Sequence, residues 1–504
     1  MKEAPCLIEY GGSPLRLNNM NLSDKLKKKV FRQIGETADR LGRPVYVVGG
    51  YVRDIFLNRT SADIDFVTVG SGIELAREVA KDLPGKNRLS VFATYGTAQI
   101  RHRDLELEFV GARKESYRRD SRNPIVENGT LDDDQRRRDF TINAMAISLN
   151  ADTFGEVVDP FGGLEDLDRK IIRTPLDPDI TFSDDPLRMM RAIRFATQLE
   201  FDILPETFEA IRRNASRIEI ITKERINDEL GKIMRARRPS IGLDLLEKAG
   251  LMELIFPEIH ALKGVETKEG RGHKDNFYHT LQVVDNVAAR SDNEWLRWAA
   301  LLHDVGKPVT KEWEPGTGWT FRNHNFIGEK MIPPLFRKMK LPMNEKMKYV
   351  AKLVGLHMRP QQVGEEKVSD SGVRRLLTDA GEDIEDLMIL AESDLTSKNP
   401  VKVRTALEGF AHLRERMADL KDADAYRNWK NPIRGDEVME RLGIPPCPRL
   451  GQLLQQVKDA ILDGHVANDH DAAWAYLETL VTPEDRGSAG GTSTSKSSAP
   501  DSAC

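Results

Sequence analysis

The chain has 504 residues, of which 39% are hydrophobic and 31% charged, and its formal net charge is −5 at pH 7. At roughly 150 residues a domain, this length predicts about three domains. No stretch approaches the roughly 20 apolar residues that a membrane helix needs, and the N-terminal segment lacks the apolar core of a signal peptide, so we expect neither membrane insertion nor export. Cys6, Cys447 and Cys504 are too few and too scattered for a disulfide framework, which favours a cytoplasmic location.

The negative net charge argues against a protein coated in nucleic acid, but basic residues cluster at 25–29, 136–138 and 235–238. Such patches can bind RNA without a basic total, although each alone is more often a solvated face.

The pattern of residues changes along the chain, from short β-like runs to long amphipathic helices and then to a tail rich in Gly, Ser and Thr that we expect to be disordered. The expected parts are an N-terminal helical extension (1–44), an α/β head (45–175), a helical neck (176–260), a second helical unit (261–420), a C-terminal helical region (421–485) and the tail (486–504).

The strand that begins at Asp63 is the most informative feature. Side chains alternate along a strand, so Asp63 and Asp65 leave on one face while Ile64 and Phe66 leave on the other, apolar face. Two converging carboxylates suit Mg²⁺, which shares its coordination sphere between carboxylates and substrate phosphates. The pattern indicates phosphoryl transfer to or from a nucleotide.

Upstream of this strand, an apolar run ends in Gly49 and Gly50 before a helix, so backbone N–H groups and the positive end of the helix face outward. We interpret this turn as a cradle for a triphosphate, to which Arg53 adds a charge-assisted contact. A tight strand-to-helix turn with no ligand is the alternative, and for the glycine pair alone it would be the more common case.

A third carboxylate is expected from a neighbouring strand, because two-metal sites often draw on one. The runs 96–101 and 105–110 are predicted to form a hairpin that places Glu106 and Glu108 on one face. Only one of the two needs to reach the metal, and an exposed hairpin face without a ligand is an equally weighted alternative.

Farther along, Asp139 stands directly after three arginines that end with Arg138. A carboxylate among arginines is well placed to accept a bond from a ribose hydroxyl while the guanidinium groups hold phosphates. The polar stretch 116–135 before it is expected to be a mobile loop beside the site.

A helix is predicted to start at Ser183, which can cap it, with Asp184 and Asp185 in its first turn. Asp185 and Arg188 are three residues apart and share a face. The carboxylate can accept a bond from the exocyclic amine of cytosine or adenine, whereas guanine and uracil present a carbonyl and leave it unpaired. Without the head, a capped helix with an exposed charged face would be the better interpretation.

The second helical unit carries His and Asp residues at the edges of apolar helices, where an unpaired polar side chain would be costly. Each histidine alone is most often a satisfied core residue, but the ordered set predicts a metal site. The set comprises His279, His303, Asp304 and Asp394, with His324 and His357 available for a second metal position.

Taken in order, these motifs resemble those of the class II tRNA nucleotidyltransferases, the family of CCA-adding enzymes and bacterial poly(A) polymerases. The resemblance covers about residues 45–234. It implies an α+β fold with a polymerase-β-like nucleotidyltransferase head, an all-helical neck and body, and a fused all-helical HD domain. It also implies Mg²⁺ on Asp63 and Asp65, Glu108 as the third carboxylate, and contacts to the incoming nucleotide from a further set of residues. That set is Gly50, Arg53, Arg138, Asp185, Arg188, Arg191 and Arg194.

The resemblance implies an enzyme that adds CMP and AMP to tRNA 3′ ends from CTP and ATP without a nucleic-acid template. Family members usually have Glu where this chain has Asp184, which puts the support of Arg188 in doubt. An A-adding enzyme or a poly(A) polymerase is the nearest alternative, and an RNA-binding HD protein without catalysis is another. The HD unit itself resembles metal-dependent phosphohydrolases, with a transition metal as the expected ion.

Overall fold

The computed structural model describes residues 20–118, 121–272, 274–365, 370–397, 399–421, 431–482 and 485. The chain divides into two compact units, Met1–Ala261 and Leu262–Cys504, and the division falls where the second helical unit was expected to begin. The expected tail at 486–504 lies outside the described residues. In the part of the chain that the structure describes, no helix is both long enough and apolar enough to span a membrane.

A seven-stranded sheet forms the head, in the order β3-β4-β5-β2-β1-β8-β9. β2 and β5 run parallel, and the other neighbouring strands are antiparallel. The predicted hairpin is confirmed as β4 paired with β5. The strands are β1 (Val45–Val48), β2 (Asp63–Thr68), β3 (Arg88–Phe92), β4 (Thr97–His102), β5 (Leu105–Gly111), β8 (Ala146–Ser148) and β9 (Val157–Val158).

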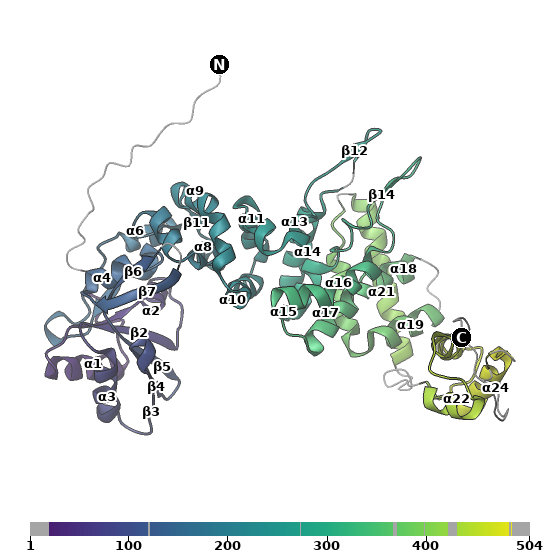
Figure 1. Cartoon of the computed structure of the whole chain (residues 1–504), viewed down its shortest axis with the longest axis horizontal. Helices are drawn as coiled ribbons and strands as arrows, with labels where there is room; N and C mark the ends of the chain where they lie inside the picture. Colours follow the sequence, from purple (N-terminus) through teal and green to yellow (C-terminus); the bar gives the residue numbers. More distant parts are fainter. Residues whose placement is uncertain are drawn as a thin grey trace, which may run out of the picture. The chain divides into compact units, whose positions relative to one another are not determined.

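Helices α1 (Lys29–Arg40) and α3 (Gly72–Asp82) pack on the apolar side of this sheet (Figure 1). The ring of Phe66 stacks on Phe109 with centroids 4.9 Å apart, and Phe31 of α1 lies 6.3 Å from Phe66. The even-numbered side chains of β2 are therefore buried in the core, and Asp63 and Asp65 point to the opposite face of the sheet.

The loop predicted at 116–135 is wrong in its secondary structure. Most of its described residues fall in β6 (Arg113–Arg118), β7 (Ser121–Asn128) and α4 (Leu131–Arg136), and β6 pairs with β7 as an antiparallel hairpin. Pro124 did not prevent the strand, since both strands of a two-stranded ribbon are edges and need not donate on their outer side. Thr130 begins α4 with a capping box to Asp133.

The helix predicted to start at Ser183 is also corrected. Ser183 lies inside α7 (Pro178–Asp184), the helix is interrupted at Asp185, and α8 begins at Leu187. Pro186 explains the break, because a proline disfavours helical geometry in the residue before it, and Asp185 is extended. The remaining elements of the first unit are η1 (Ala93–Tyr95), η2 (Ala151–Thr153), α2 (Gly50–Phe56), α5 (Thr141–Ala144), α6 (Gly163–Arg169), β10 (Ile171–Ile172), α8 (Leu187–Leu199), β11 (Asp202–Ile203), α9 (Pro205–Asn214), η3 (Ala215–Ile220), α10 (Lys223–Met234), α11 (Pro239–Lys248), α12 (Leu251–Ile255) and α13 (Pro257–His260).

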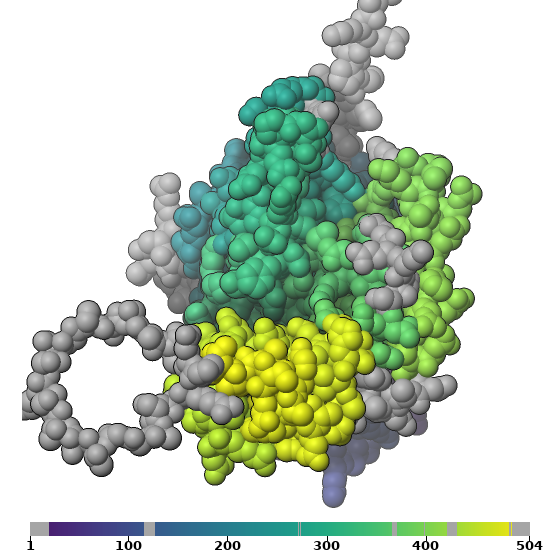
Figure 2. Space-filling model, turned by 90° about the vertical axis from the view of Figure 1, so that its right-hand side faces the viewer, coloured from purple at the N-terminus to yellow at the C-terminus, as the bar shows by residue number. Residues whose placement is uncertain are grey.

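The second unit is a bundle of helices with two short hairpins, β12 (Thr267–Lys268) with β13 (Arg271–Gly272) and β14 (Glu312–Glu314) with β15 (Gly318–Thr320). Its last three helices surround a small core of their own and form the compact yellow lobe of Figure 2. The helices are α14 (Asn276–Ala288), α15 (Glu294–Leu302), α16 (His324–Met339), α17 (Glu345–Leu356), α18 (Arg359–Glu365), α19 (Asp370–Ala380), α20 (Ile384–Ser393), α21 (Pro400–Lys421), α22 (Gly435–Leu442), α23 (Pro448–Leu462) and α24 (His470–Leu480), with η4 (Gly381–Asp383) before α20.

Candidate functional sites

The head carboxylates meet on one face of the sheet. In the parallel pair of β2 and β5, Asp65 lies opposite Glu108 and Asp63 opposite Glu106. Burial raises the pKa of Asp65 to about 6; Arg138 opposes this rise, and the charges of Asp63 and Glu108 add to it. Burial, followed by the charge of Asp63, likewise raises the pKa of Glu108. Crowded acids that resist ionisation fit a divalent cation, which would relieve their mutual repulsion.

The ligand atoms of these carboxylates are not drawn together. Among the described residues, the groups of three potential ligand atoms within 4.8 Å of one another all lie in the second unit.

Gly49 brings the backbone close to this face. Its φ of 75° is in the left-handed region, and a Cβ there would lie 3.3 Å from Asp65 Oδ2 and 3.2 Å from Arg138 Nη1. A side chain would therefore crowd the space between the carboxylate and the guanidinium. Arg138 is itself fixed by the buried Asp134, with Nη2 and Oδ2 3.0 Å apart.

Arg53 is joined to Arg191 through two buried side chains. Arg53 Nη1 donates to Asn143 Oδ1 over 2.9 Å, and Asn143 Nδ2 donates to Asp139 Oδ1 over 3.1 Å. Arg191 Nε donates to Asp139 Oδ2 over 2.8 Å. Asp139 is only 8% exposed, and its pKa is about 2 because Arg191 and Asn143 outweigh the effect of burial. In this structure the carboxylate is engaged in holding Arg191, and its role as a ribose reader stays a prediction.

The turn between α7 and α8 carries the predicted base reader. Asp185 Oδ1 accepts a bond of 3.2 Å from the N–H of Leu187 and so caps α8, while Oδ2 lies 3.7 Å from Arg225 Nη2. Arg188 Nη2 donates to the carbonyl of Arg137 over 2.7 Å. Beside this turn is a cavity of about 180 Å³, which the structure lines with basic, acidic and apolar side chains. They are Lys114, Asp133, Arg136, Arg137, Leu176, Ile180, Thr181, Asp184 and Arg188.

Arg194 is buried in the neck and paired with Glu229. Arg194 Nε lies 2.5 Å from Glu229 Oε2, and the two side chains are 10% and 4% exposed. The guanidinium also covers the ring of Phe195 at 3.9 Å from its centroid. The contacts shown for Arg194 are therefore internal, and they fix the helix that carries Arg188 and Arg191.

In the second unit, imidazoles stand where helices end. His303 directly follows α15, and His357 directly follows α17. Each donates its Nδ1 proton to the carbonyl three residues earlier, Ala300 at 2.8 Å and Val354 at 2.7 Å. The last carbonyls of a helix have no partner within it, so they hold the ring and fix the tautomer. The Nε2 atoms of the two rings are left pointing into the unit.

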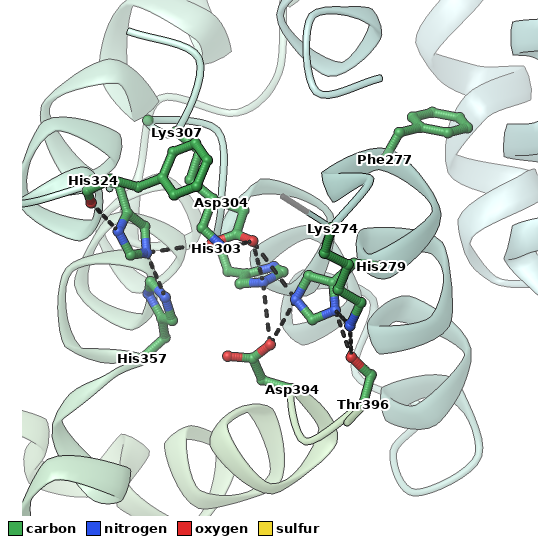
Figure 3. A network of polar contacts seen from close by, with 12 residues as sticks. Lys274, Phe277, His279, His303, Asp304, Lys307, His324, His357, Asp394 and Thr396 are labelled. Atoms are coloured by element: carbon green, nitrogen blue, oxygen red, sulfur yellow. Dashed lines mark hydrogen bonds and ion pairs between the residues drawn. The ribbon is translucent and has the colours of Figure 1, made fainter. Parts of the chain in front are cut away.

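Six side chains converge inside the second unit, as Figure 3 shows: His279, His303, Asp304, His324, His357 and Asp394. His279 Nε2 lies 2.8 Å from Asp394 Oδ1, and His324 Nε2 lies 3.3 Å from Asp304 Oδ1. Two groups have ligand atoms within 4.8 Å of one another, and Asp304 belongs to both. The groups are His279, His303 and Asp304, and Asp304, His324 and His357.

The electrostatics of this cluster fit bound cations. Nε2 of His303 is buried and lies 3.3 Å from Asp304 Oδ2 and 3.6 Å from Asp394 Oδ1. Burial lowers the pKa of His303, but Asp304 and Asp394 outweigh it and raise the value to about 10. The charge of His303, with that of Lys307, overcomes burial and lowers the pKa of Asp304 well below its usual range. A buried space with imidazole and carboxylate ligands suits transition metals.

Comparison with known proteins assigns the family. The Poly A polymerase head domain matches residues 45–173, the probable RNA and SrmB-binding site of polymerase A matches 200–263, and the HD domain matches 276–398. The A-adding tRNA nucleotidyltransferase of Deinococcus radiodurans is 31% identical, over 84% of this chain and 93% of the relative. The chain belongs to the tRNA nucleotidyltransferase and poly(A) polymerase family. The fold class and the enzyme class expected from the sequence are thereby confirmed.

Other members of the tRNA nucleotidyltransferase family bear different names. The Multifunctional CCA protein of Shewanella frigidimarina is 34% identical, over 59% of this chain and 70% of the relative. A solved tRNA nucleotidyltransferase in complex with a primer tRNA and an incoming ATP analogue is 26% identical, with a TM-score of 0.54 over 78% of this chain and 99% of that one. Both the A-adding and the CCA-adding branches therefore stand among the relatives.

Three buried residues of these sites escaped the sequence analysis: Asp134, Asn143 and Glu229. Each holds an arginine that the sequence did suggest, namely Arg138, Arg53 or Arg194. Asp134 carried a usable signal, because it stands three and four residues before Arg137 and Arg138 on one helical face. Glu229 is 35 residues from its partner, and no local pattern connects them.

Proposed function

We propose that this chain adds CMP and AMP to the 3′ ends of tRNA in the cytoplasm, using CTP and ATP and no nucleic-acid template. The observation that carries the proposal is the shared face of Asp63, Asp65 and Glu108 beside the Gly49 bend. These residues would hold Mg²⁺, which lowers the pKa of the attacking hydroxyl and neutralises the leaving group. The relative named as a multifunctional CCA protein supports the same activity.

The transfer requires no covalent intermediate on the protein. The 3′ oxygen of the RNA forms a bond to the α-phosphorus of the nucleotide, the bond between that phosphorus and the bridging oxygen breaks, and pyrophosphate leaves with the electron pair. The proton of the 3′ hydroxyl passes to water. Arg53 and Arg138 would hold the triphosphate. The buried hydrogen bonds that join Arg53 to Arg191 through Asn143 and Asp139 keep these arginines in place.

Base selection is assigned to Asp185 with Arg188 on the turn before α8. The carboxylate would accept from the amino group of cytosine or adenine, and Arg188 would donate to a ring acceptor. A base that presents a carbonyl leaves the carboxylate unpaired, at a cost of about 1 to 3 kcal/mol.

One incorporation assay tests the activity. The purified chain is incubated with tRNA lacking its last three nucleotides, or lacking only the last one, and with each labelled nucleotide singly. We expect CMP on the first substrate and AMP on the second, with release of pyrophosphate. Asp65→Ala should abolish transfer and leave tRNA binding within about twofold, since it removes a metal ligand and no RNA contact. Transfer at the wild-type rate by this variant contradicts the proposal.

Addition of AMP alone is the second candidate. It is favoured by the A-adding relative from Deinococcus radiodurans, whose match extends over 84% of this chain, whereas the multifunctional CCA relative named above matches 59%. CTP incorporation into the shorter tRNA excludes this candidate, and AMP incorporation without CMP establishes it.

For the second unit we propose a metal-dependent phosphohydrolase that acts on phosphomonoesters or cyclic phosphodiesters. The two ligand groups that share Asp304 carry this proposal, because paired metals can hold both the attacking and the leaving oxygen. Opening of 2′,3′-cyclic AMP to 2′- or 3′-AMP and release of phosphate from p-nitrophenyl phosphate are measured separately, with Ni²⁺, Mn²⁺ or Co²⁺ supplied. Hydrolysis that persists in Asp304→Asn contradicts the assignment.

A further inference from the structure

The chemistry proposed above determines from which side the RNA must approach. In an in-line displacement the attacking oxygen and the leaving oxygen lie on opposite sides of the phosphorus. The groups assigned to the triphosphate, Gly49 and Arg138, lie beside Asp65 on the side of β1. With the reaction axis along the strand order of the sheet, the 3′ end of the RNA comes from the side of β5.

Beyond β5 the sheet continues into β4 and β3, and the strand register carries the carboxylate face across both. Residues that pair across neighbouring strands share a face of the sheet. Two rows of such pairs cross the four strands: Asp65, Glu108, Gln99 and Ser90, and Asp63, Glu106, Arg101 and Arg88.

Side-chain contacts agree with this shared face. Arg101 Nη2 lies 2.7 Å from Glu106 Oε1, and Gln99 Nε2 donates to Glu106 Oε2 over 3.3 Å. α3 packs against β3, β4 and β5. The alternate side chains Ala98, Ile100 and Leu107 are buried, whereas Arg88 and Arg101 are exposed. At about 4.8 Å between strands, Arg101 is about 10 Å and Arg88 about 14 Å from Asp63 along the row.

An exposed aromatic ring extends the same face. Phe92 has the same parity as Arg88 along β3, and it is 47% exposed. Tyr95, in the turn that follows, is 70% exposed. Arginines for phosphates and an uncovered ring for stacking are the usual components of a surface for single-stranded nucleic acid. An apolar core residue would be expected to be covered instead.

We propose that the β3–β4 strip, defined as Arg88, Ser90, Phe92, Gln99 and Arg101, binds the single-stranded 3′ end of the RNA substrate. Arg88 and Arg101 contact its phosphates, Phe92 stacks on a base, and the strip guides the terminal hydroxyl towards Asp63 and Glu108. The inference rests on the proposed nucleotidyltransferase activity. β3 is also an edge strand, so self-association through it is the competing use of this surface.

Steady-state kinetics of the full chain test the strip. We expect Arg88→Ala, Arg101→Ala and Phe92→Ala each to raise the KM for tRNA about tenfold, within the range of about 5- to 150-fold set by one lost stacking or phosphate contact. The KM for ATP should stay within twofold. Arg77→Ala is the matched control, since Arg77 is an exposed arginine on α3 across the sheet, and its KM for tRNA should not change.

A binding measurement keeps this test independent of catalysis. Fluorescence anisotropy compares tRNA that carries its single-stranded 3′ nucleotides with tRNA trimmed back to the paired acceptor stem. The wild type should prefer the tailed form, and the three strip variants should lose that preference. Retained preference overturns the strip, whether or not the wild type transfers nucleotides, whereas failure of transfer alone counts against the proposed function. A strip variant that changes the sedimentation coefficient and leaves RNA binding intact also overturns it, in favour of self-association.

Discussion

Nε2 of His324 lies 3.4 Å from Nε2 of His357, although both rings give their Nδ1 protons to backbone carbonyls. Both Nε2 atoms therefore point to one place inside the second unit, and both side chains are buried. Burial, followed by the charge of His303, lowers the pKa of His357 to about 4, so this ring is neutral at neutral pH and offers its Nε2 lone pair. A metal ion held by these two rings would share the ligand Asp304 with a second ion position, as the two ligand groups suggest.

Metal content is the first expected outcome. The gently purified chain should contain two divalent transition-metal ions, measured by inductively coupled plasma mass spectrometry. His357→Ala should lose one of them, because it removes a ligand of one group only, and Asp304→Asn should lose both. His412→Ala, on the exposed side of α21, is the control and should keep both. A full complement in Asp304→Asn contradicts the dinuclear arrangement.

The two glutamates of β5 should differ sharply in their effect on transfer. Glu108 lies opposite Asp65, which is half-buried, whereas Glu106 is partly exposed and pairs with Arg101. We expect Glu108→Gln to lower kcat by at least about a hundredfold, the scale of a lost transition-state electrostatic contact. Glu106→Gln is the matched control and should change kcat by less than about threefold, since it loses only a surface ion pair. Equal losses in rapid-quench assays would place the third carboxylate elsewhere.

Base choice should depend on the charge of Asp185. An asparagine keeps the shape and can present an N–H to the carbonyl of uracil or guanine. We expect Asp185→Asn to lower the preference for CTP over UTP about ten- to a hundredfold, measured as the ratio of kcat/KM values. Glu219→Gln, an exposed acid on η3, provides the control. An unchanged ratio in Asp185→Asn would remove this residue from base selection.

Stability should depend strongly on the buried Arg194–Glu229 pair. Removing the carboxylate leaves a guanidinium buried and uncompensated, so Glu229→Ala should lower the free energy of unfolding by about 3 to 5 kcal/mol in urea titrations. Glu209→Ala breaks a pair whose side chains are more than half exposed, and its cost should be below about 1 kcal/mol. Similar midpoints for the two variants would mean that water reaches Arg194.

Local patterns predicted what depends on local geometry. The alternation around Asp63 and Asp65 correctly assigned the two faces of β2, and the hairpin placed Glu108 on the matching face of β5. The parallel pairing of these strands could not be seen in either strand alone. Asn143 escaped because its bond to Arg53, 90 residues away in the sequence, depends on how α2 and α5 meet.

The break at Asp185 could have been predicted, because Pro186 stands directly after it. The prediction of a helix start at Ser183 relied instead on the acidic residues expected in its first turn. In the structure the proline separates α7 from α8, and Asp185 is freed from helical geometry. Because the helix is interrupted at this point, Oδ2 of Asp185 lies near Arg225 and makes no bond within the described helices α7 and α8.

The parallel pairing of β2 and β5 determines which side chains of β5 lie beside Asp65. Since successive side chains point to opposite sides, sliding β5 by a single residue would bury Glu108 among phenylalanines and bring Leu107 or Phe109 beside Asp65. The positions of Asp63, Asp65 and Glu108 therefore depend on the main-chain hydrogen bonds between β2 and β5 as much as on the side chains themselves. An insertion or deletion in the short turn between β4 and β5 should be as damaging as losing the carboxylate itself.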